Sequence, residues 1–403
     1  MKSLLRRRDV RLLLGGQSLS MFGDWAMIIV LGIWTKVLTG SNGAAGLVFF
    51  VFALASLAAP LGGLVVDRVA KRPLMISTHL ALAAVMCLLL LVHDRSDVWL
   101  IYTVTILYGL GGDIFAAARS SMLKAMLPDA LLGEANGALQ SLREGLRLIA
   151  PVAGAGLFAL WGGSVVALVD AATFVASAAT LVALPFVEPP PAPTEEHFFR
   201  EVSAGFGHIW RTLPLRQLTV GLGVAMLVVG FSETLIFAVT ANGLHRSPAF
   251  IGVLEVFQGI GSVAGGITAA RLLRSIGDVR LTGLGLVMFA MGDAFLLVPR
   301  MGTVLAGAVL AGVGIVWAVV ALATAYQQRS PQAVQGRVNA AANMLFSVPQ
   351  TISIAVGAAL ITVVDYRVEI VAMGAVVLVA AAYLLTRREA ETEPVEIAER
   401  LAA

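Results

Sequence analysis

The chain has 403 residues, of which 58% are apolar and 13% are charged, and its formal net charge is +3 at pH 7. Soluble domains carry about 25% charged residues, so this chain has about half the charge that a water-facing surface needs. Its mean hydropathy is +0.88. The composition excludes a water-soluble enzyme and a disordered chain, and it predicts an integral membrane protein whose surface faces lipid.

Apolar runs of about 18 or more residues, long enough to cross a bilayer as a helix, recur along the whole sequence. The first six spans are expected near 11–35, 43–66, 73–92, 97–121, 137–161 and 163–186, and the second six near 217–240, 249–270, 281–299, 302–327, 338–364 and 368–386. The first run is too long for the apolar region of a signal peptide, so we expect a retained helix. The predicted fold class is all-α integral membrane, with twelve transmembrane helices.

A long polar stretch at 188–216 separates the two sets of spans. It opens with four prolines within 188–193, which favour an extended linker. Residues 195–212 then predict an amphipathic surface helix that ties the two halves together. Its apolar face comprises Phe198, Phe199, Val202, Phe206, Ile209 and Trp210. We therefore expect six-helix bundles at 1–187 and 217–387, the linker between them, and a tail at 388–403.

The distribution of Lys and Arg orients the predicted spans. If the amino terminus is cytoplasmic, 21 of these residues fall on the cytoplasmic side and 5 on the other. Basic residues are enriched in cytoplasmic connections. This imbalance predicts a multi-pass protein of the cell membrane, with the linker and both termini in the cytoplasm.

The two sets of six spans share an internal repeat. Two stretches, 128–138 before the fifth span and 331–341 before the eleventh, match at five positions that all differ by 203 residues. The same offset relates Gly63 to Gly266 and Arg68 to Arg271. Because the offset is about half the chain, it predicts two parallel six-helix halves related by an axis normal to the membrane.

The residues that follow the second span identify a family. The stretch 63–72, Gly-Leu-Val-Val-Asp-Arg-Val-Ala-Lys-Arg, resembles the G-x-x-x-D-R-x-G-R-R/K signature of the major facilitator superfamily, with Ala70 in place of its second glycine. The resemblance implies that Asp67 docks on helix eleven in the outward-facing state. It makes Gly63, Asp67, Arg68, Lys71 and Arg72 candidates for a conformational gate. The alternative is that the basic residues only set the topology.

Other stretches resemble one branch of that superfamily. In the fifth span Gly137, Pro151 and Gly154 fit an antiporter signature, G-x8-G-x3-G-P-x-x-G-G, whose other glycines are replaced. A Pro-kinked, close-packing helix is the alternative explanation. The stretches 16–24 and 335–339 are similar to the twelve-helix exporters of drugs, macrolides and siderophores.

Three acids lie inside spans that, by the resemblance, line a central cavity. A carboxylate within a bilayer is costly and usually faces a partner or a cavity. Asp24, Asp113 and Glu233 are therefore candidates for proton coupling. Structural hydrogen bonds are the alternative for each, and Asp113 has a possible partner in Arg119.

The fifth span holds a charged group of its own. Arg143 and Arg147 share a helical face, and Glu144 points about 100° away. The two cations would attract an anionic group. The alternative is a cytoplasmic gate network with Asp67 and Arg119. Glu144 is a further candidate for proton coupling.

The remaining candidates concern the substrate. Trp25, Phe231, Phe237 and Trp317 are aromatic residues placed to contact an apolar ligand, and Glu255 and Gln258 share one face of the eighth span. There is no G-x-x-x-x-G-K-[ST] phosphate loop and no His/Cys cluster with metal spacing, so we expect neither an enzyme nor a cofactor or metal.

The function that these features favour is secondary active export of an amphipathic small molecule, coupled to proton influx. The substrate class is a drug, a secondary metabolite or a siderophore. The alternatives are a nutrient importer or facilitator, or a non-transporting membrane receptor that reuses the fold. The expected partners are the lipid bilayer, the small molecule and protons, with no nucleic acid, and we expect a monomer.

Overall fold

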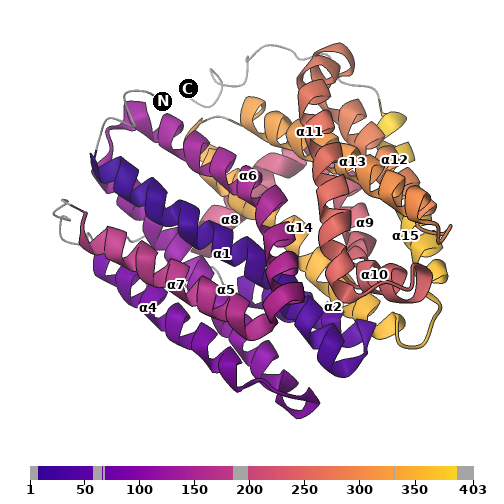
Figure 1. Cartoon of the computed structure of the whole chain (residues 1–403). Coiled ribbons are helices and arrows are strands. Elements are labelled where there is room, and N and C mark those ends of the chain that lie inside the picture. Colours follow the sequence, from indigo (N-terminus) through magenta and orange to yellow (C-terminus); the bar gives the residue numbers. More distant parts are fainter. Residues whose placement is uncertain (1–7, 58–65, 67–68, 185–197, 331, 388–403) are drawn as a thin grey trace, which may run out of the picture.

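The computed structural model describes residues 8–57, 66, 69–184, 198–330 and 332–387, and these segments form helices joined by short turns (Figure 1). Inside a bilayer no water is present to bond exposed backbone groups. A helix bonds its own backbone N–H and C=O groups, which is why apolar runs of this length adopt it.

The first half of the chain packs as one helical bundle. Its helices are α1 (Arg8–Thr39), α2 (Asn42–Ser56), α4 (Lys71–Cys87) with its extension η2 (Leu88–Leu91), η3 (Arg95–Asp97) leading into α5 (Val98–Met126), α6 (Asp129–Trp161) and α7 (Gly163–Val182). Helix α1 contacts both α6 and α7, and α4 packs against α5 and α7.

The second half forms a second bundle. It contains α8 (Phe198–Arg211), α9 (Leu213–Val229), α10 (Ser232–Ala238), the π-helical turn η4 (Val239–Gly243), η5 (Pro248–Phe250), α11 (Ile251–Ile276), α12 (Asp278–Phe295), α13 (Met301–Gln328), α14 (Gln332–Leu360) and α15 (Tyr366–Leu385). Helix α13 packs on α11 and α12, and α15 packs on α12 and α9.

Nine helices in the described segments are long and apolar enough to cross a membrane. Helix α2 (Asn42–Ser56) and the part of α6 at Gly145–Trp161 are shorter apolar helices. Helix α12 is 18 residues long and carries Asp278, Arg280 and Asp293. Within the described residues each of the twelve expected spans contains a helix, and nine helices meet both criteria of length and composition; residues 58–65 of the second span lie outside the described residues.

The seventh predicted span, 217–240, is interrupted in the structure. Helix α9 ends at Val229 and α10 begins at Ser232. At the break, a Cβ on Gly230 would lie 2.7 Å from the carbonyl oxygen of Gln350 in α14. The close approach of the α14 backbone therefore requires glycine here. Gly230 and Phe231 keep helical dihedral angles, so the chain continues in the same direction and Glu233 falls in the first turn of α10.

Two turns between helices depend on glycine. Gly162, between α6 and α7, and Gly277, between α11 and α12, both have a φ of +78°. That conformation is unfavourable for residues with a Cβ. Each glycine reverses the chain within one residue and places the next helix antiparallel to the one before it.

Helix α8, expected at 195–212, covers Phe198–Arg211 and packs on α14. Ile209 is fully buried, and the ring of Phe206 stacks on the ring of Trp210 at 5.9 Å between centroids. These two aromatic side chains are exposed. His208 Nε2 lies 3.0 Å from the carbonyl oxygen of Arg329 at the end of α13. The linker helix therefore belongs to the second bundle.

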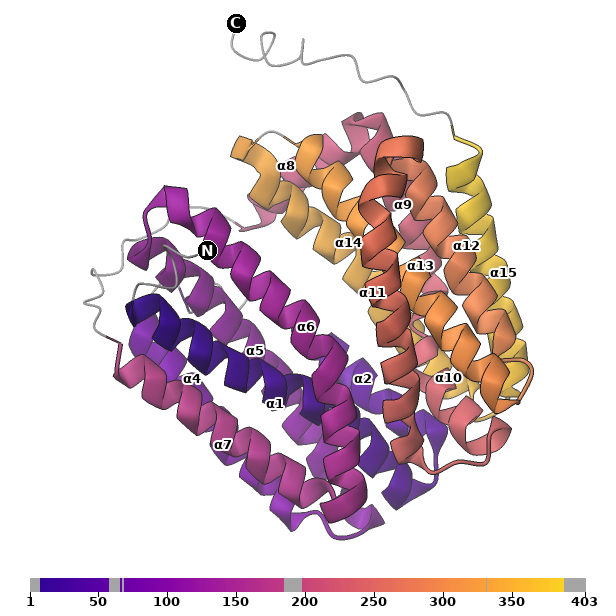
Figure 2. The same ribbon diagram turned by 45° about the horizontal axis from the view of Figure 1, so that its top comes forward.

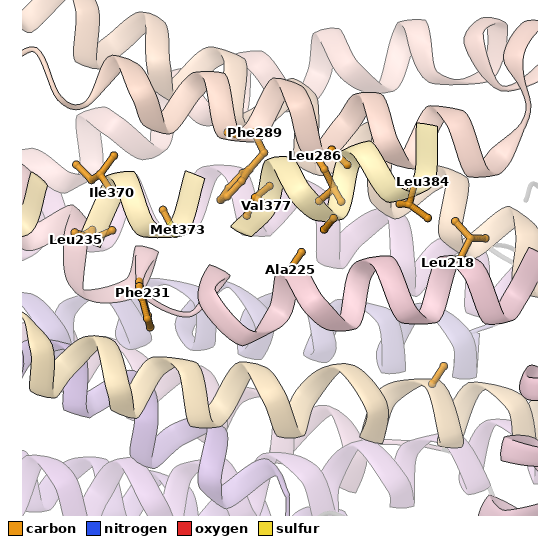
Figure 3. Close-up of a cluster of buried hydrophobic side chains, with 14 of the residues drawn as sticks. Leu218, Ala225, Phe231, Leu235, Leu286, Phe289, Ile370, Met373, Val377 and Leu384 are labelled. Atoms are coloured by element: carbon orange, nitrogen blue, oxygen red, sulfur yellow. The ribbon is translucent and has the colours of Figure 1, made fainter. Parts of the chain in front are cut away.

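Buried hydrophobic side chains form a cluster within the second bundle and another in the first bundle, which also takes in Phe237, Ile251 and Ile354 of the second half. In the second half, side chains from α9, α10, α12 and α15 meet in one cluster that includes Ala225, Phe231, Phe289 and Met373 (Figure 3). In the first half, Phe174 of α7 is packed with residues of α1, α4 and α5.

The two bundles meet at one end of the molecule. We call the end at which α8 lies, α1 begins and α15 ends the α8 end, and the opposite end the far end. In Figure 2 the bundles diverge toward the α8 end and approach each other toward the far end. The contacts that join them, described next, are at the far end.

Candidate functional site

Glycines on α2 allow the two halves to approach closely. A Cβ on Gly43 would lie 2.5 Å from the carbonyl oxygen of Ala358 in α14. A Cβ on Gly46, one turn later, would overlap the hydroxyl of Thr234 in α10. Small residues permit such close packing between membrane helices. The far end of the interface is therefore closed by close contacts of the α2 backbone with α14 and α10.

Helix α6 of the first half meets α11 of the second half in the same way. A Cβ on Gly252 would lie 2.8 Å from the Cβ of Ala155. Between these two contact lines, Phe49 and Phe237 face each other across the interface with ring centroids 6.1 Å apart. The far end is thus sealed by glycine contacts on both flanks and by an aromatic pair.

A polar group surrounds Asp24 in the first half. The hydroxyl of Tyr108 on α5 donates a hydrogen bond of 2.8 Å to Oδ1 of Asp24. Arg119 and Arg143 lie within electrostatic range of the same carboxyl group. Asp170 of α7 is 1% exposed and lies against Gly23, where a Cβ would overlap its carboxylate. Helices α1, α5, α6 and α7 together therefore position one ionisable centre.

Arg119 belongs to this group through Gln17. Its Nη1 donates to Oε1 of Gln17 over 2.7 Å. The pairing of Arg119 with Asp113 that the sequence left open is not formed. Six residues separate the two on α5, which puts them on different faces. Within the described chain, Oδ2 of Asp113 is buried without a hydrogen-bond partner.

A second ionisable group crosses the interface between the halves. The guanidinium of Arg147 on α6 lies 5.5 Å above the ring of Trp25 on α1. The charges of Arg147 and Glu255 both act on Glu233 of α10, and the charge of Arg147 also acts on Glu255 of α11. Residues from two helices of each half therefore converge, which makes this group a candidate site.

The gate residues proposed from the signature are only partly described. Gly63, Asp67 and Arg68 lie outside the described residues, as does the side chain of Glu144. Arg72 donates from Nε and Nη2 to the carbonyl oxygens of Leu181 and Val182, at 2.9 and 2.7 Å. It therefore caps the end of α7.

The other basic candidates for the gate are distributed differently. Lys71 Nζ donates to the carbonyl oxygen of Val69. Arg119 and Arg143 lie close enough to affect each other and Asp24. Arg147 faces the second half instead. The structure therefore divides the two span-five arginines, Arg143 and Arg147, between two charged groups.

The aromatic candidates take different positions. Phe231 is 6% exposed, belongs to the core of the second bundle and packs against Gly357 (Figure 3). Phe237 is 1% exposed at the far-end seal. Packing covers both rings in this conformation, and their role as walls of a substrate cavity stays a prediction. Trp317 is half-buried and donates from Nε1 to the hydroxyl of Thr268 on α11, and Gln258 is also half-buried.

Several partners were missed by sequence reasoning. Tyr108 and Gln17 carry no pattern of their own and matter only because folding brings them to Asp24 and Arg119. His79 of α4 is 1% exposed, and its ring stacks on Phe115 at 3.7 Å. A lone histidine inside the third span was the available signal. Arg329 and Asp278 form a bidentate ion pair at the α8 end, with both donor–acceptor distances at 3.0 Å.

Comparison with known proteins shows the family. The model of the Major Facilitator Superfamily matches residues 13–240 and 221–402, and the chain belongs to that superfamily of membrane transporters. The uncharacterized MFS-type transporter YfiS of Bacillus subtilis is 25% identical over 287 residues, which are 68% of this chain and 67% of that protein. Macrolide efflux protein A of Enterococcus faecalis is 22% identical over 212 residues, which are 52% of this chain and 66% of that protein.

Solved structures share the fold. A bacterial homologue of the iron transporter ferroportin in the inward-facing state has a TM-score of 0.72 and 15% sequence identity, covering 94% of this chain and 98% of that chain. The outward-facing state of that homologue has a TM-score of 0.62 and 16% identity, covering the same shares of the two chains. The protein is thus a multi-pass membrane protein with the fold of this transporter superfamily, and not an enzyme.

Proposed function

We propose that this chain is a secondary active exporter that moves an amphipathic small molecule out of the cytoplasm by alternating access, coupled to proton influx. The observation that carries the proposal is the convergence of ionisable side chains from both halves at their interface. Arg147 of the first half and Glu233 and Glu255 of the second act on one another there. Charged groups are expensive inside a bilayer, and a transport path is their usual reason.

The contacts between the halves support alternating access. They are concentrated at the far end, where glycines on α2 and α11 meet the opposite bundle. The greater similarity to an inward-facing than to an outward-facing structure agrees with closure at that end. We propose that the α8 end is cytoplasmic, as the distribution of Lys and Arg predicts. Rocking of the two bundles would then expose the site to each side in turn.

Proton coupling is assigned to Asp24. Its carboxyl group accepts a hydrogen bond from Tyr108 and lies in range of two arginines. Protonation would weaken the attraction of the carboxyl group for Arg119 and Arg143, which lie on α5 and α6. A change in charge on α1 would thereby bias the packing of three helices.

The export direction and the class of substrate rest on the relatives. One of these is named as an MFS-type transporter, and another is named for macrolide efflux. A drug or a secondary metabolite of amphipathic character is the substrate class that we propose, with a siderophore within the same class. One chain supplies both halves, so we propose a functional monomer.

Everted membrane vesicles test the function. Acidification of the vesicle lumen should drive accumulation of a fluorescent amphipathic dye, and collapse of the pH gradient should release it. Asp24→Asn should abolish this accumulation. Asp365→Asn is the matched control, because it removes an exposed carboxylate outside the spans while asparagine still caps α15. Flux in the reverse direction would establish import, and the absence of flux would favour a receptor. Either result refutes the proposal.

A further inference from the structure

The charged group at the interface contains more acid than base. Two carboxyl groups, Glu233 and Glu255, come from α10 and α11 of the second half. Arg147 of α6 is the cation whose charge acts on both. The other nearby arginines, Arg119 and Arg143, act on Asp24 instead. With both glutamates ionised, the pair and Arg147 together carry one net negative charge.

The packing of α6 on α11 brings Arg147 and Glu255 to similar positions along the helix axes. The two helices run antiparallel and touch where Gly252 meets Ala155. Glu255 lies three residues beyond Gly252 toward the α8 end, and Arg147 lies eight residues before Ala155 in the same direction. At about 1.5 Å per residue the two backbones differ in depth by about 7.5 Å. An arginine and a glutamate side chain together span that distance.

Glu233 and Glu255 are half-buried, so their excess negative charge is partly withdrawn from water and favours a further cation. An ionised group removed from water is costly unless it is paired. Arg147 supplies one positive charge for two acids, so one carboxylate charge is left unbalanced when both acids are ionised. The charge of the site is therefore balanced best when a second cation is bound.

The chemistry of the cluster favours an organic cation over a metal ion. Metal ions in proteins take several oxygen, nitrogen or sulfur ligands. In the part of the chain that the structure describes, no group of three or more His, Cys, Asp or Glu residues is arranged to hold one. In addition, the ring of Trp25 already accepts a guanidinium on its face, at 5.5 Å. An aromatic face beside two carboxylates suits an ammonium or phosphonium group with an apolar body.

We propose that Glu233 and Glu255 form the recognition site for an organic monocation with an apolar body, and that Arg147 is the internal counter-ion that the ligand competes with. This rests on the proposed transport function, since it names the substrate class of the same site. The bound cation displaces Arg147 from the acids and from the face of Trp25.

Equilibrium binding with two ions of opposite charge and nearly the same shape tests the proposal. The full chain is purified in detergent and titrated with radiolabelled tetraphenylphosphonium or with tetraphenylborate. We expect the cation to bind and the anion to bind at least about tenfold more weakly. Glu233→Gln and Glu255→Gln should each weaken cation binding at least about tenfold, and neither should weaken anion binding.

Arg147→Gln should change the affinity for the cation in the opposite direction. Removing the internal competitor should strengthen cation binding about tenfold. A variant that merely damages the fold weakens binding, so a gain is not produced by misfolding. Asp365→Asn is the matched control and should bind both ions as the parent chain does. Equal binding of the two ions, an unchanged affinity in both glutamate variants, or a loss of affinity in Arg147→Gln would overturn the proposal.

The outcome is separable from that of the transport assay. Charge-selective binding without any flux driven by a pH gradient would leave the recognition site standing and refute export. Conversely, flux of a neutral or anionic dye in a chain that does not bind tetraphenylphosphonium would refute the cation site and keep the exporter.

Discussion

Closure of the far end depends on the absence of a side chain at Gly43. This residue is buried on α2 and faces the backbone of α14. An added Cβ would lie 2.5 Å from the carbonyl oxygen of Ala358 and 2.8 Å from Cγ2 of Thr362. The first of these atoms belongs to the backbone and cannot rotate away. Gly43→Ala therefore forces α2 and α14 apart.

The expected magnitude follows from the location of the clash. Overpacking a close contact costs about 1–3 kcal/mol. Alanine also favours a helix over glycine by about 1 kcal/mol, but this gain is the same in both conformations and cancels. Because Gly43 and Ala358 lie in different halves, the clash exists only when the far end is closed. A cost of about 2 kcal/mol shifts the equilibrium about 30-fold toward the far-end-open state.

Distances between spin labels at the far end measure this shift. Arg95 of the first half and Arg300 of the second are exposed there and are replaced by cysteine in a Cys87→Ser background. In Gly43→Ala the longer of two inter-label distances should become the major population. Gly112→Ala is the control, because a Cβ there meets nothing within 4 Å and the helix gain is similar. Distance distributions that do not differ between the two variants would refute the reasoning.

Two further substitutions test the charged groups. Tyr108→Phe removes the 2.8 Å hydrogen bond to Asp24. Because a hydrogen bond to a charged group contributes about 1.5–3 kcal/mol, flux driven by a pH gradient should fall at least about tenfold, while equilibrium binding of tetraphenylphosphonium stays within about twofold. An equal loss of flux and binding would contradict a role of Tyr108 in coupling. Arg329→Lys replaces the guanidinium, which donates two hydrogen bonds to Asp278, by a single ammonium donor. Thermal unfolding in detergent should show that the free energy of unfolding falls by about 1–2 kcal/mol. An unchanged midpoint would mean that the bidentate geometry adds nothing to stability.

The sequence predicted where the long apolar helices lie with little error. The sixth span was expected at 163–186 and α7 covers Gly163–Val182, and the tenth was expected at 302–327 and α13 covers Met301–Gln328. The reason is that lipid imposes helix on any long apolar segment, so composition alone is sufficient. The irregular turn between α9 and α10 was not predicted; it lies where Gly230 packs closely against α14.

The candidate site was also predictable only in part from the sequence. Asp24, Arg147, Glu233 and Glu255 were all identified from the sequence because ionisable residues are rare in apolar spans. Their partners were not. Arg119 pairs with Gln17, 102 residues away, rather than with Asp113 on its own helix.

Composition and charge alone therefore determined that this protein lies in a membrane, where its helices run and which residues within them are expensive to bury. Only the tertiary structure decided that Arg147 faces Glu233 and Glu255 across the two halves while Arg143 remains with Asp24. The physical reason is that these helices are apolar on most sides, so no hydrophobic stripe reveals which face of a helix packs inward. The rotation and tilt of each helix come from close contacts such as Gly252 against Ala155, and those contacts select the partners.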